Sequence, residues 1–141
     1  SVSFSPDGQT IATASSDNTA RLWNLKGKLL HEFKVHQSGF NSVSFSPDGQ
    51  TIATASSDNT ARLWNLKGEL LQELKGHQSS VTSVSFSPDG QTIASASDDN
   101  TARLWAVRNL DRAIKDGCDW LKDYLHNLPD SDQDRQLCDG V

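Results

Sequence analysis

The sequence predicts an all-β repeat fold over its first part, and an internal repeat with strand-like segments is the basis for this. The repeated phrase begins at Ser1, Ser42 and Ser83, so the period is 41 residues. The first two copies are identical over residues 1–27 and 42–68. Repeats of this length are supersecondary units, and each unit buries its apolar faces only by stacking on a neighbour. We therefore expect three similar β-units in a stack.

The middle copy shows the elements most clearly, and its four expected strands are residues 40–45, 51–57, 60–65 and 69–74. The first alternates β-branched and aromatic residues with polar ones, which is typical of a strand. The following turn contains Pro47, which presets φ, and Gly49, which permits a positive φ. Helix is the rival interpretation for residues 69–74 on propensity, although the short turns on either side favour a strand. Small residues on both faces of the inner strands suit a sheet enclosed between two similar sheets.

The composition limits the classes of protein. Hydrophobic residues make up 35% and charged residues 22% of the chain, as in globular proteins. The net charge of -5 argues against a phosphate-binding surface, so we expect no nucleic acid partner. Neither a membrane-spanning run nor a signal peptide is found, so we expect a cytoplasmic protein without a membrane partner. The absence of methionine indicates a processed product or a piece of a longer protein.

Several phrases carry a resemblance to a known family. In the third copy they are Gly76-His77, Phe86-Ser87-Pro88-Asp89-Gly90 and Leu104-Trp105. With these phrases and their counterparts, residues 1–107 resemble the WD-repeat β-propeller family. The resemblance implies a propeller part over residues 1–108, with blades at 1–34, 40–75 and 81–107, the third without its outer strand. The sequence departs from the family pattern where Trp-Asn and Trp-Ala replace the usual Trp-Asp dipeptide.

The resemblance also implies hydrogen-bonded tetrads that join the strands of each blade. Their members are His36, Ser56, Asp58 and Trp64 in the second blade, and His77, Ser97, Asp99 and Trp105 in the third. The first blade has Ser15, Asp17 and Trp23 but no histidine, because the chain begins after its place. The Ser-His-Asp triad of hydrolases is the rival interpretation. An enzyme needs one site, whereas this set recurs in the blades, so we expect structural tetrads, no catalytic residue and no cofactor.

The resemblance further places partner-binding residues on one face of the blades, beside the first strand and in the turn between the second and third. By position these are Ser16, Gly39, Asn41, Ser57, Ser80, Thr82 and Asp98. The rival interpretation is that these small polar residues are solvated loop positions. No exposed aromatic cluster accompanies them, so we expect recognition by three blades alone to be weak.

Beyond Asn109 the residue pattern changes and the chain becomes strongly acidic. Apolar residues recur at helical spacing until Pro129 ends the run. We expect a short α-helical tail over residues 109–141, which either caps the propeller or docks a partner. Cys118 and Cys138 lack the Cys-x-x-Cys spacing of zinc sites, so no metal is expected.

The closing segment resembles that of long bacterial WD-repeat proteins, cyanobacterial ones in particular, in which blades often follow a signalling domain. The leading hypothesis is a non-catalytic protein–protein interaction module, a scaffold or sensor in bacterial signalling within a larger propeller. Closed propellers take about 4–8 blades, so blades upstream in the parent chain or further copies of this chain must complete the ring, and we favour the first. The alternative function is a self-assembling propeller built from several copies of this chain. The identity of the repeats favours this homo-oligomer, and the tail counts against it.

Overall fold

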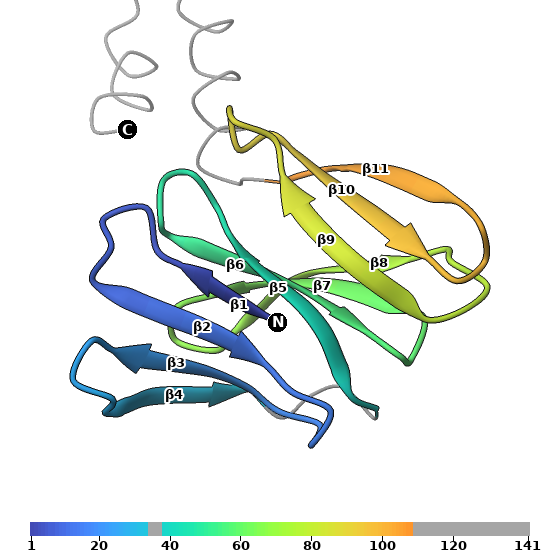
Figure 1. The fold of residues 1–141 in the computed structure, drawn as a ribbon. Helices are drawn as coiled ribbons and strands as arrows, with labels where there is room; N and C mark the ends of the chain where they lie inside the picture. The colour runs from blue at the N-terminus through green and yellow to red at the C-terminus, as the bar shows by residue number, and fades with distance from the viewer. Residues whose placement is uncertain (34–37, 109–141) are drawn as a thin grey trace, which may run out of the picture. The chain divides into compact units, whose positions relative to one another are not determined.

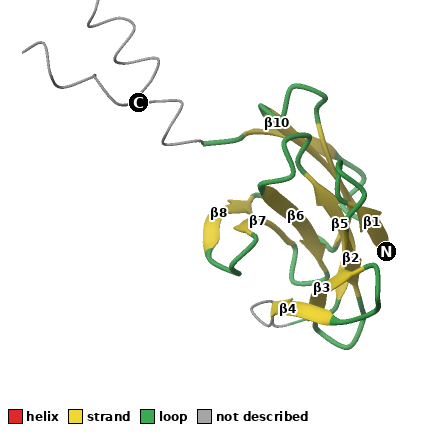
Figure 2. Cartoon of the chain, turned by 90° about the vertical axis from the view of Figure 1, so that its left-hand side faces the viewer, coloured by secondary structure: helices red, strands yellow, loops and turns green. Residues whose placement is uncertain are grey.

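The computed structural model describes residues 1–33 and 38–108, and this part of the chain consists of eleven β-strands joined by turns and loops (Figure 2). The expectation of an all-β fold is confirmed for these residues, which contain no helix. Residues 1–107 form one compact unit, and residues 108–141 are assigned to a second. The expected helical tail and the loop that contains His36 lie outside the described residues, so both stay predictions.

The strands pair in three antiparallel sheets, one for each repeat (Figure 1). The first sheet contains β1 (Val2–Phe4), β2 (Thr10–Ala14), β3 (Ala20–Asn24) and β4 (Leu29–Phe33). The second contains β5 (Phe40–Phe45), β6 (Thr51–Ser56), β7 (Thr60–Asn65) and β8 (Leu70–Lys75). The third contains β9 (Val81–Phe86), β10 (Thr92–Ser97) and β11 (Ala102–Ala106). In each sheet, strands that are neighbours in sequence are neighbours in space, which is the order of a meander.

The turns between the strands follow from the residues in them. After β5, the Gly49 N–H donates to the Ser46 carbonyl at 2.9 Å, and Gly49 has a φ of 70°. Asn59 and Asn100 have φ values of 68° and 64° in the turns after β6 and β10, a conformation that asparagine tolerates better than most residues. The fourth segment of the second repeat is strand β8 rather than the rival helix, because the preceding turn sets it antiparallel to β7 and the two backbones pair.

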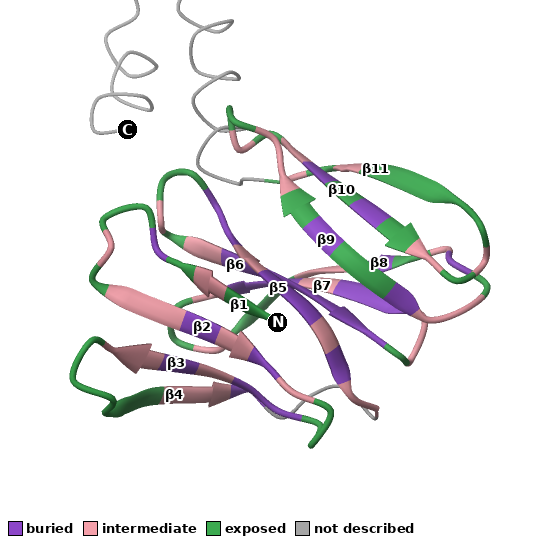
Figure 3. Ribbon diagram, viewed as in Figure 1, coloured by how far each residue is buried: buried purple, intermediate pink, exposed green. Residues whose placement is uncertain are grey.

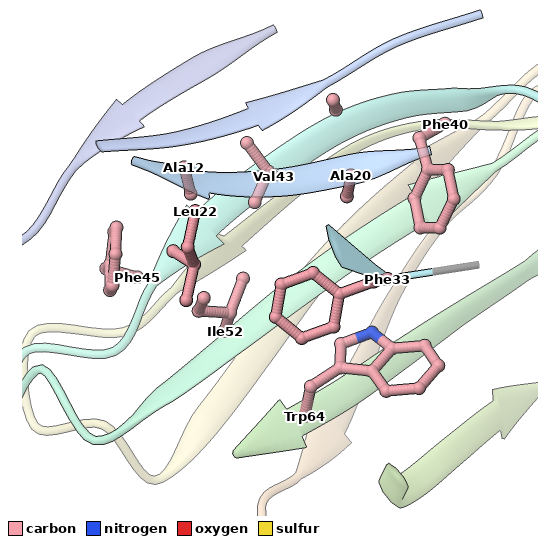
Figure 4. Close-up of a cluster of buried hydrophobic side chains, with 10 residues drawn as sticks. Ala12, Ala20, Leu22, Phe33, Phe40, Val43, Phe45, Ile52 and Trp64 are labelled. Carbon is pink, nitrogen blue, oxygen red and sulfur yellow. The ribbon is translucent and has the colours of Figure 1, made fainter. Parts of the chain in front are cut away.

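The first two sheets pack face to face through a shared apolar core (Figure 4). Its residues are Ala12, Ala14, Ala20, Leu22, Phe33, Phe40, Val43, Phe45, Ile52 and Trp64. The alanines of the first sheet leave room for the aromatic side chains of the second. Large residues opposite small ones allow two twisted sheets to approach at the packing density of a protein interior.

The same arrangement recurs between the second and third sheets. The core residues there are Ala53, Ala55, Ala61, Leu63, Leu74, Val81, Val84 and Ile93. The second sheet is therefore covered on both faces, as its small residues predicted. Among the described residues, the first and third sheets each keep one face with exposed apolar side chains, such as Phe4 and Leu104. Figure 3 shows exposed stretches along β9 and β11 of the third sheet.

Two irregularities in strand pairing occur at the same place in the second and third sheets. In β5 the register shifts between Phe40 and Ser42, which leaves Asn41 without a cross-strand partner. In β9 it passes from Val81 to Ser83 and leaves out Thr82 in the same way. A β-bulge redirects the side chain of its extra residue. Both bulged residues belong to the predicted partner-binding set, so the bulges determine how that set is arranged.

Candidate interaction rim and its buried polar network

A chain of side-chain hydrogen bonds runs through the third sheet. His77, in the loop before β9, lies with Nδ1 2.7 Å from Asp99 Oδ2 and with Nε2 2.8 Å from Ser95 Oγ. Trp105 Nε1 donates to the same Ser95 Oγ at 2.8 Å. His77 and Ser95 are buried. These hydrogen bonds therefore connect a loop to strands β10 and β11 inside the protein.

The donors and acceptors of this chain are all satisfied together. With a neutral imidazole, His77 Nδ1–H donates to Asp99, and Nε2 accepts the Ser95 hydroxyl proton. The Ser95 oxygen in turn accepts the indole N–H of Trp105. Hydrolase triads use the same order of contacts, but here the serine is buried and its donor and acceptor are both engaged. The contacts therefore support a structural role for the set.

The serine that takes part in these hydrogen bonds is Ser95, and the prediction of Ser97 in that place was wrong. The Ser97 hydroxyl instead donates to the Ser79 carbonyl at 3.0 Å. Both serines lie on the same face of β10, so strand alternation does not distinguish them. Trp105 is paired across the sheet with Ile93, and its indole N–H reaches the diagonal neighbour two residues along β10. That neighbour is Ser95.

In the other two sheets, too, the hydroxyl that accepts the indole N–H is not the predicted one. Trp64 Nε1 donates to Thr54 Oγ1, and Trp23 Nε1 donates to Thr13 Oγ1, both at 2.9 Å. The serines predicted in these places, Ser56 and Ser15, do not meet the indoles. A signal for the hydroxyl position was present in the sequence: the third copy replaces this threonine with serine, which keeps the hydroxyl.

The predicted serines instead close the turns between the second and third strands, and the aspartates take part in the same turns. Asp58 Oδ1 accepts both the backbone N–H and the hydroxyl of the threonine two residues on, at 3.1 and 2.6 Å. The Asp58 N–H donates to Ser56 Oγ at 3.2 Å. Asp17 makes the equivalent contacts, with Ser15 as its acceptor. Such Asx-type contacts are typical of tight turns.

Hydrogen bonds favour the charged form of two of these carboxylates. The Thr19 hydroxyl is the main cause that lowers the pKa of Asp17 to about 2. The Thr101 hydroxyl, followed by the Gln78 backbone N–H, holds the pKa of Asp99 well below its ordinary value. Hydrogen bonds donated to a carboxylate stabilise its ionised form. The turns are therefore most stable when these aspartates are charged.

Gly76, which precedes His77, has a packing role. A Cβ at this position would lie 3.0 Å from Arg103 Nη1 and 3.2 Å from Trp105 Cη2. These distances are shorter than ordinary van der Waals contact, so a side chain here would displace the tryptophan. The Gly-His dipeptide thus lets the loop lie close enough for the imidazole to reach the strands.

Three of the predicted rim residues meet at the boundary between the second and third sheets. Asn41 Nδ2 lies 3.0 Å from Ser80 Oγ, 2.8 Å from the Val81 carbonyl oxygen and 3.1 Å from Ser57 Oγ. The Ser57 hydroxyl lies 3.2 Å from Asn41 Oδ1. These contacts hold the loops of two adjacent sheets in a fixed relation.

The remaining predicted rim residues lie in the loops and strand ends nearby. Gly39 packs on the backbone of Ser16, because a Cβ at Gly39 would lie 3.1 Å from the Ser16 Cα. The Thr82 hydroxyl donates to a carbonyl of β10 at 3.2 Å. The Asp98 N–H donates to the Ser80 carbonyl, in the loop before β9, at 3.0 Å. Four members of the set are exposed: Ser16, Ser57, Thr82 and Asp98. All seven belong to the same end of the sheets, which we call the rim.

Two kinds of feature were searched for in residues 1–33 and 38–108. No group of three or more His, Cys, Asp or Glu side chains is placed to hold a metal ion in this part of the chain. The same residues contain no helix of the length and apolar character needed to cross a membrane.

The three repeats match an established protein family. Residues 1–24, 27–65 and 68–106 match the WD domain, G-beta repeat family. These ranges cover most of the chain, so the chain belongs to this family. WD repeats form protein–protein interaction modules, and the proteins that carry them are generally non-catalytic.

One relative is WD repeat-containing protein slr1409 of Synechocystis sp. (strain ATCC 27184 / PCC 6803 / Kazusa). The two sequences are 46% identical over 39 residues, which are 28% of this chain and 12% of the relative. The matched segment therefore spans a small part of the relative's length. The expected resemblance to cyanobacterial WD-repeat proteins is confirmed by this match.

Proposed function

We propose that this chain is a non-catalytic scaffold or sensor that holds a partner protein at its rim, as part of a larger WD-repeat propeller. The observation that carries the proposal is the hydrogen-bonded group of Asn41, Ser57 and Ser80, which joins the rim loops of two adjacent blades. Interaction modules present loops in fixed positions on a rigid scaffold. Here the two apolar cores supply the scaffold. The likeness to a Synechocystis WD repeat-containing protein supports a bacterial setting.

The chemistry of the rim favours a polar partner segment. Its hydroxyl and amide groups donate and accept hydrogen bonds, and Asp98 adds a negative charge in the third blade. A partner that places a lysine or arginine near Asp98 would fit this surface. The rim residues include no large aromatic anchor, so each blade contributes little binding energy by itself. Affinity then depends on contacts with several blades at once.

The test compares full-length chains that carry single substitutions at opposite ends of the sheets. Ser57→Arg and Asp98→Arg change exposed rim residues. Gln50→Arg, in the turn between β5 and β6, changes an exposed residue at the other end and is the matched control. Partners are identified by cross-linking and mass spectrometry, and each purified partner is then titrated with the three variants.

We expect the rim substitutions to lower the affinity for a true partner at least tenfold, which is about 1.4 kcal/mol. Gln50→Arg is expected to leave the affinity within a factor of two. Partners whose affinities are the same for all three variants would contradict a binding role for the rim. If only Gln50→Arg lowered the affinity for a partner, recognition would lie at the opposite end of the sheets.

The alternative function, a propeller built from several copies of this chain, depends on the end faces of the sheet stack rather than on the rim. A specific observation favours it, because both end faces expose apolar side chains whose counterparts are buried inside the stack. Assembly of this kind is compatible with a partner at the rim.

A further inference from the structure

Leucines on the outer strands of the first two sheets, and in the turns before these strands, are exposed at the end of the sheets opposite the rim. They occupy matching positions in the two repeats and are between 39% and 56% exposed: Leu25, Leu29 and Leu30 in the first, and Leu66, Leu70 and Leu71 in the second. The second sheet already has a neighbouring sheet on each face. Further sheets at the ends of the stack would therefore leave its three leucines exposed, unlike Phe4 and Leu104.

The turns that contain part of this set are held in place by side-chain hydrogen bonds. In the first repeat, Asn24 Oδ1 accepts the backbone N–H groups of Lys26 and Lys28 at 3.0 and 2.9 Å. Asn65 makes the equivalent contacts in the second repeat at the same two distances. The leucines and lysines of these turns are thus presented from a fixed backbone.

A β-bulge follows each of these turns. In β4 the pairing register shifts between Leu22 and Trp23 of β3, which leaves Leu30 without a cross-strand partner. The pairing of β8 with β7 leaves out Leu71 in the same way. Both β4 and β8 are edge strands of their sheets. A bulge disrupts the row of backbone groups on which an added strand would pair, so this edge disfavours a β-strand as the occupant.

The leucines of the two sheets belong to one surface. His31, which follows Leu30 in β4, lies against Gly68 in the turn before β8, so closely that a Cβ at Gly68 would overlap the imidazole. The outer strand of the first sheet therefore meets the turn of the second. We call the six leucines together with Lys26, Lys28 and Lys67 the leucine–lysine surface. Contiguous apolar patches of this kind mark interaction sites, whereas single exposed leucines do not.

The charge of this surface is opposite in sign to that of the chain. Its three lysines are exposed, and none of them forms an ion pair within the described ranges 1–33 and 38–108. The acidic residue of the two turns, Glu69, is engaged by Asn65 Nδ2 at 2.5 Å. An acidic partner complements the lysines. An anionic membrane is less favoured, because the chain as a whole has a net charge of -5.

We propose that the leucine–lysine surface binds an acidic amphipathic α-helix of a partner protein. Apolar residues spaced three and four apart on such a helix cover the leucines, and its carboxylates meet the lysines. Because the turns are already held by hydrogen bonds, little conformational freedom is lost on binding. The surface lies at the opposite end of the sheets from the rim, so this inference does not depend on the proposed role of the rim.

The binding test uses the full 141-residue chain and a fluorescently labelled synthetic peptide of about 18 residues, composed of leucine and glutamate in amphipathic helical order. A peptide with lysine in place of every glutamate is the matched probe. Fluorescence anisotropy is expected to show binding of the glutamate peptide with a Kd of about 0.1 mM or tighter, and binding of the lysine peptide at least about tenfold weaker.

Variants of the chain test which residues bind the peptide. Leu30→Ser and Leu71→Ser remove apolar area at the two bulges, and each is expected to lower the affinity for the glutamate peptide at least about tenfold. Leu104→Ser makes the same change at an exposed leucine outside the surface and is expected to leave the affinity unchanged. Lys28→Glu and Glu69→Lys exchange residues that the two repeats already have at this position, so both are compatible with the fold. The first is expected to weaken binding of the glutamate peptide and the second to strengthen it.

Several results would overturn the proposal. Absence of binding by the glutamate peptide shows that the surface does not take such a helix, and equal binding of the two peptides shows that the lysines do not select an acidic partner. An equal loss of affinity in Leu104→Ser and Leu30→Ser shows that the peptide binds elsewhere. If the chain instead binds vesicles of phosphatidylserine and phosphatidylcholine but not the peptide, and Leu30→Ser abolishes that binding, the occupant is a membrane.

Discussion

The Thr54→Val substitution tests whether burial determines how much the hydrogen bond between the Trp64 indole and the Thr54 hydroxyl stabilises the fold. Valine resembles threonine in shape but has no hydroxyl, so the substitution removes the acceptor that Trp64 Nε1 reaches at 2.9 Å. Both residues are fully buried between the first and third sheets. The indole N–H then loses this acceptor at a position shielded from water.

The expected loss in the free energy of unfolding follows from the burial of this hydrogen bond. Leaving a buried donor without a partner costs about 1–3 kcal/mol. The first sheet supplies a matched control, because Trp23 Nε1 donates to Thr13 Oγ1 at the same 2.9 Å within an identical sequence. There both residues are partly exposed on the open face, so water can replace the hydroxyl. We expect Thr13→Val to change the free energy of unfolding by no more than about 0.5 kcal/mol.

Urea unfolding followed by tryptophan fluorescence measures the two effects. Both substitutions are made in the otherwise unchanged 141-residue chain. A loss of about 2 kcal/mol, with a denaturant slope of about 2 kcal/mol per molar, lowers the urea midpoint by about 1 M. Equal shifts for Thr54→Val and Thr13→Val, or no shift for Thr54→Val, would refute the reasoning that burial decides the cost.

Two further predictions concern a turn glycine and the response to acid. Gly68→Ala and Gly27→Ala each place alanine at a positive φ, which costs about 1–2 kcal/mol, but only at Gly68 would the new Cβ overlap the His31 imidazole. Thermal unfolding should therefore show a larger loss for Gly68→Ala, and the excess should disappear in a His31→Ala background; equal losses would contradict the close contact. Because the pKa of Asp99 is lowered in the folded state, its contribution is present above the ordinary carboxyl pKa of about 4 and is lost as the pH falls further. Asp99→Asn should accordingly show a smaller loss of stability between pH 7 and pH 3 than the wild type, and an identical loss in both chains would show that this carboxylate does not contribute.

The strands and turns could be predicted from the sequence because they depend on short-range features. Alternation and turn residues such as Gly49 act over a few neighbours, and three copies of one pattern reinforce the same interpretation. The segment that forms β8 was ambiguous by propensity, and its pairing with β7 decides for a strand. Local preference is weak for such a segment, so the partner strand determines its conformation.

The candidate site was predicted less completely. The loop histidine, the aspartate and the tryptophan of the third blade do belong to one chain of contacts, but its hydroxyl is Ser95 rather than Ser97. The reach of the indole ring decides between two serines on one strand face, and strand periodicity contains no such information. Likewise, the bulge at Asn41 brings its amide to the next blade, and a bulge of this kind has no clear sequence signature.

The repeats separate what the sequence determines from what the tertiary structure decides. Residues 1–27 and 42–68 have the same sequence and each contribute to three successive strands with equivalent turns, which differ only in where the strands begin and end, so local structure is determined largely by the sequence itself. Their burial is nevertheless different: Phe4 is exposed and Phe45 is buried. The physical reason is that secondary structure arises from neighbours along the chain, whereas burial arises from whatever packs across the sheet. The small residues predict an enclosed sheet for both copies alike, and only the tertiary structure of the described residues shows which copy is covered on both faces.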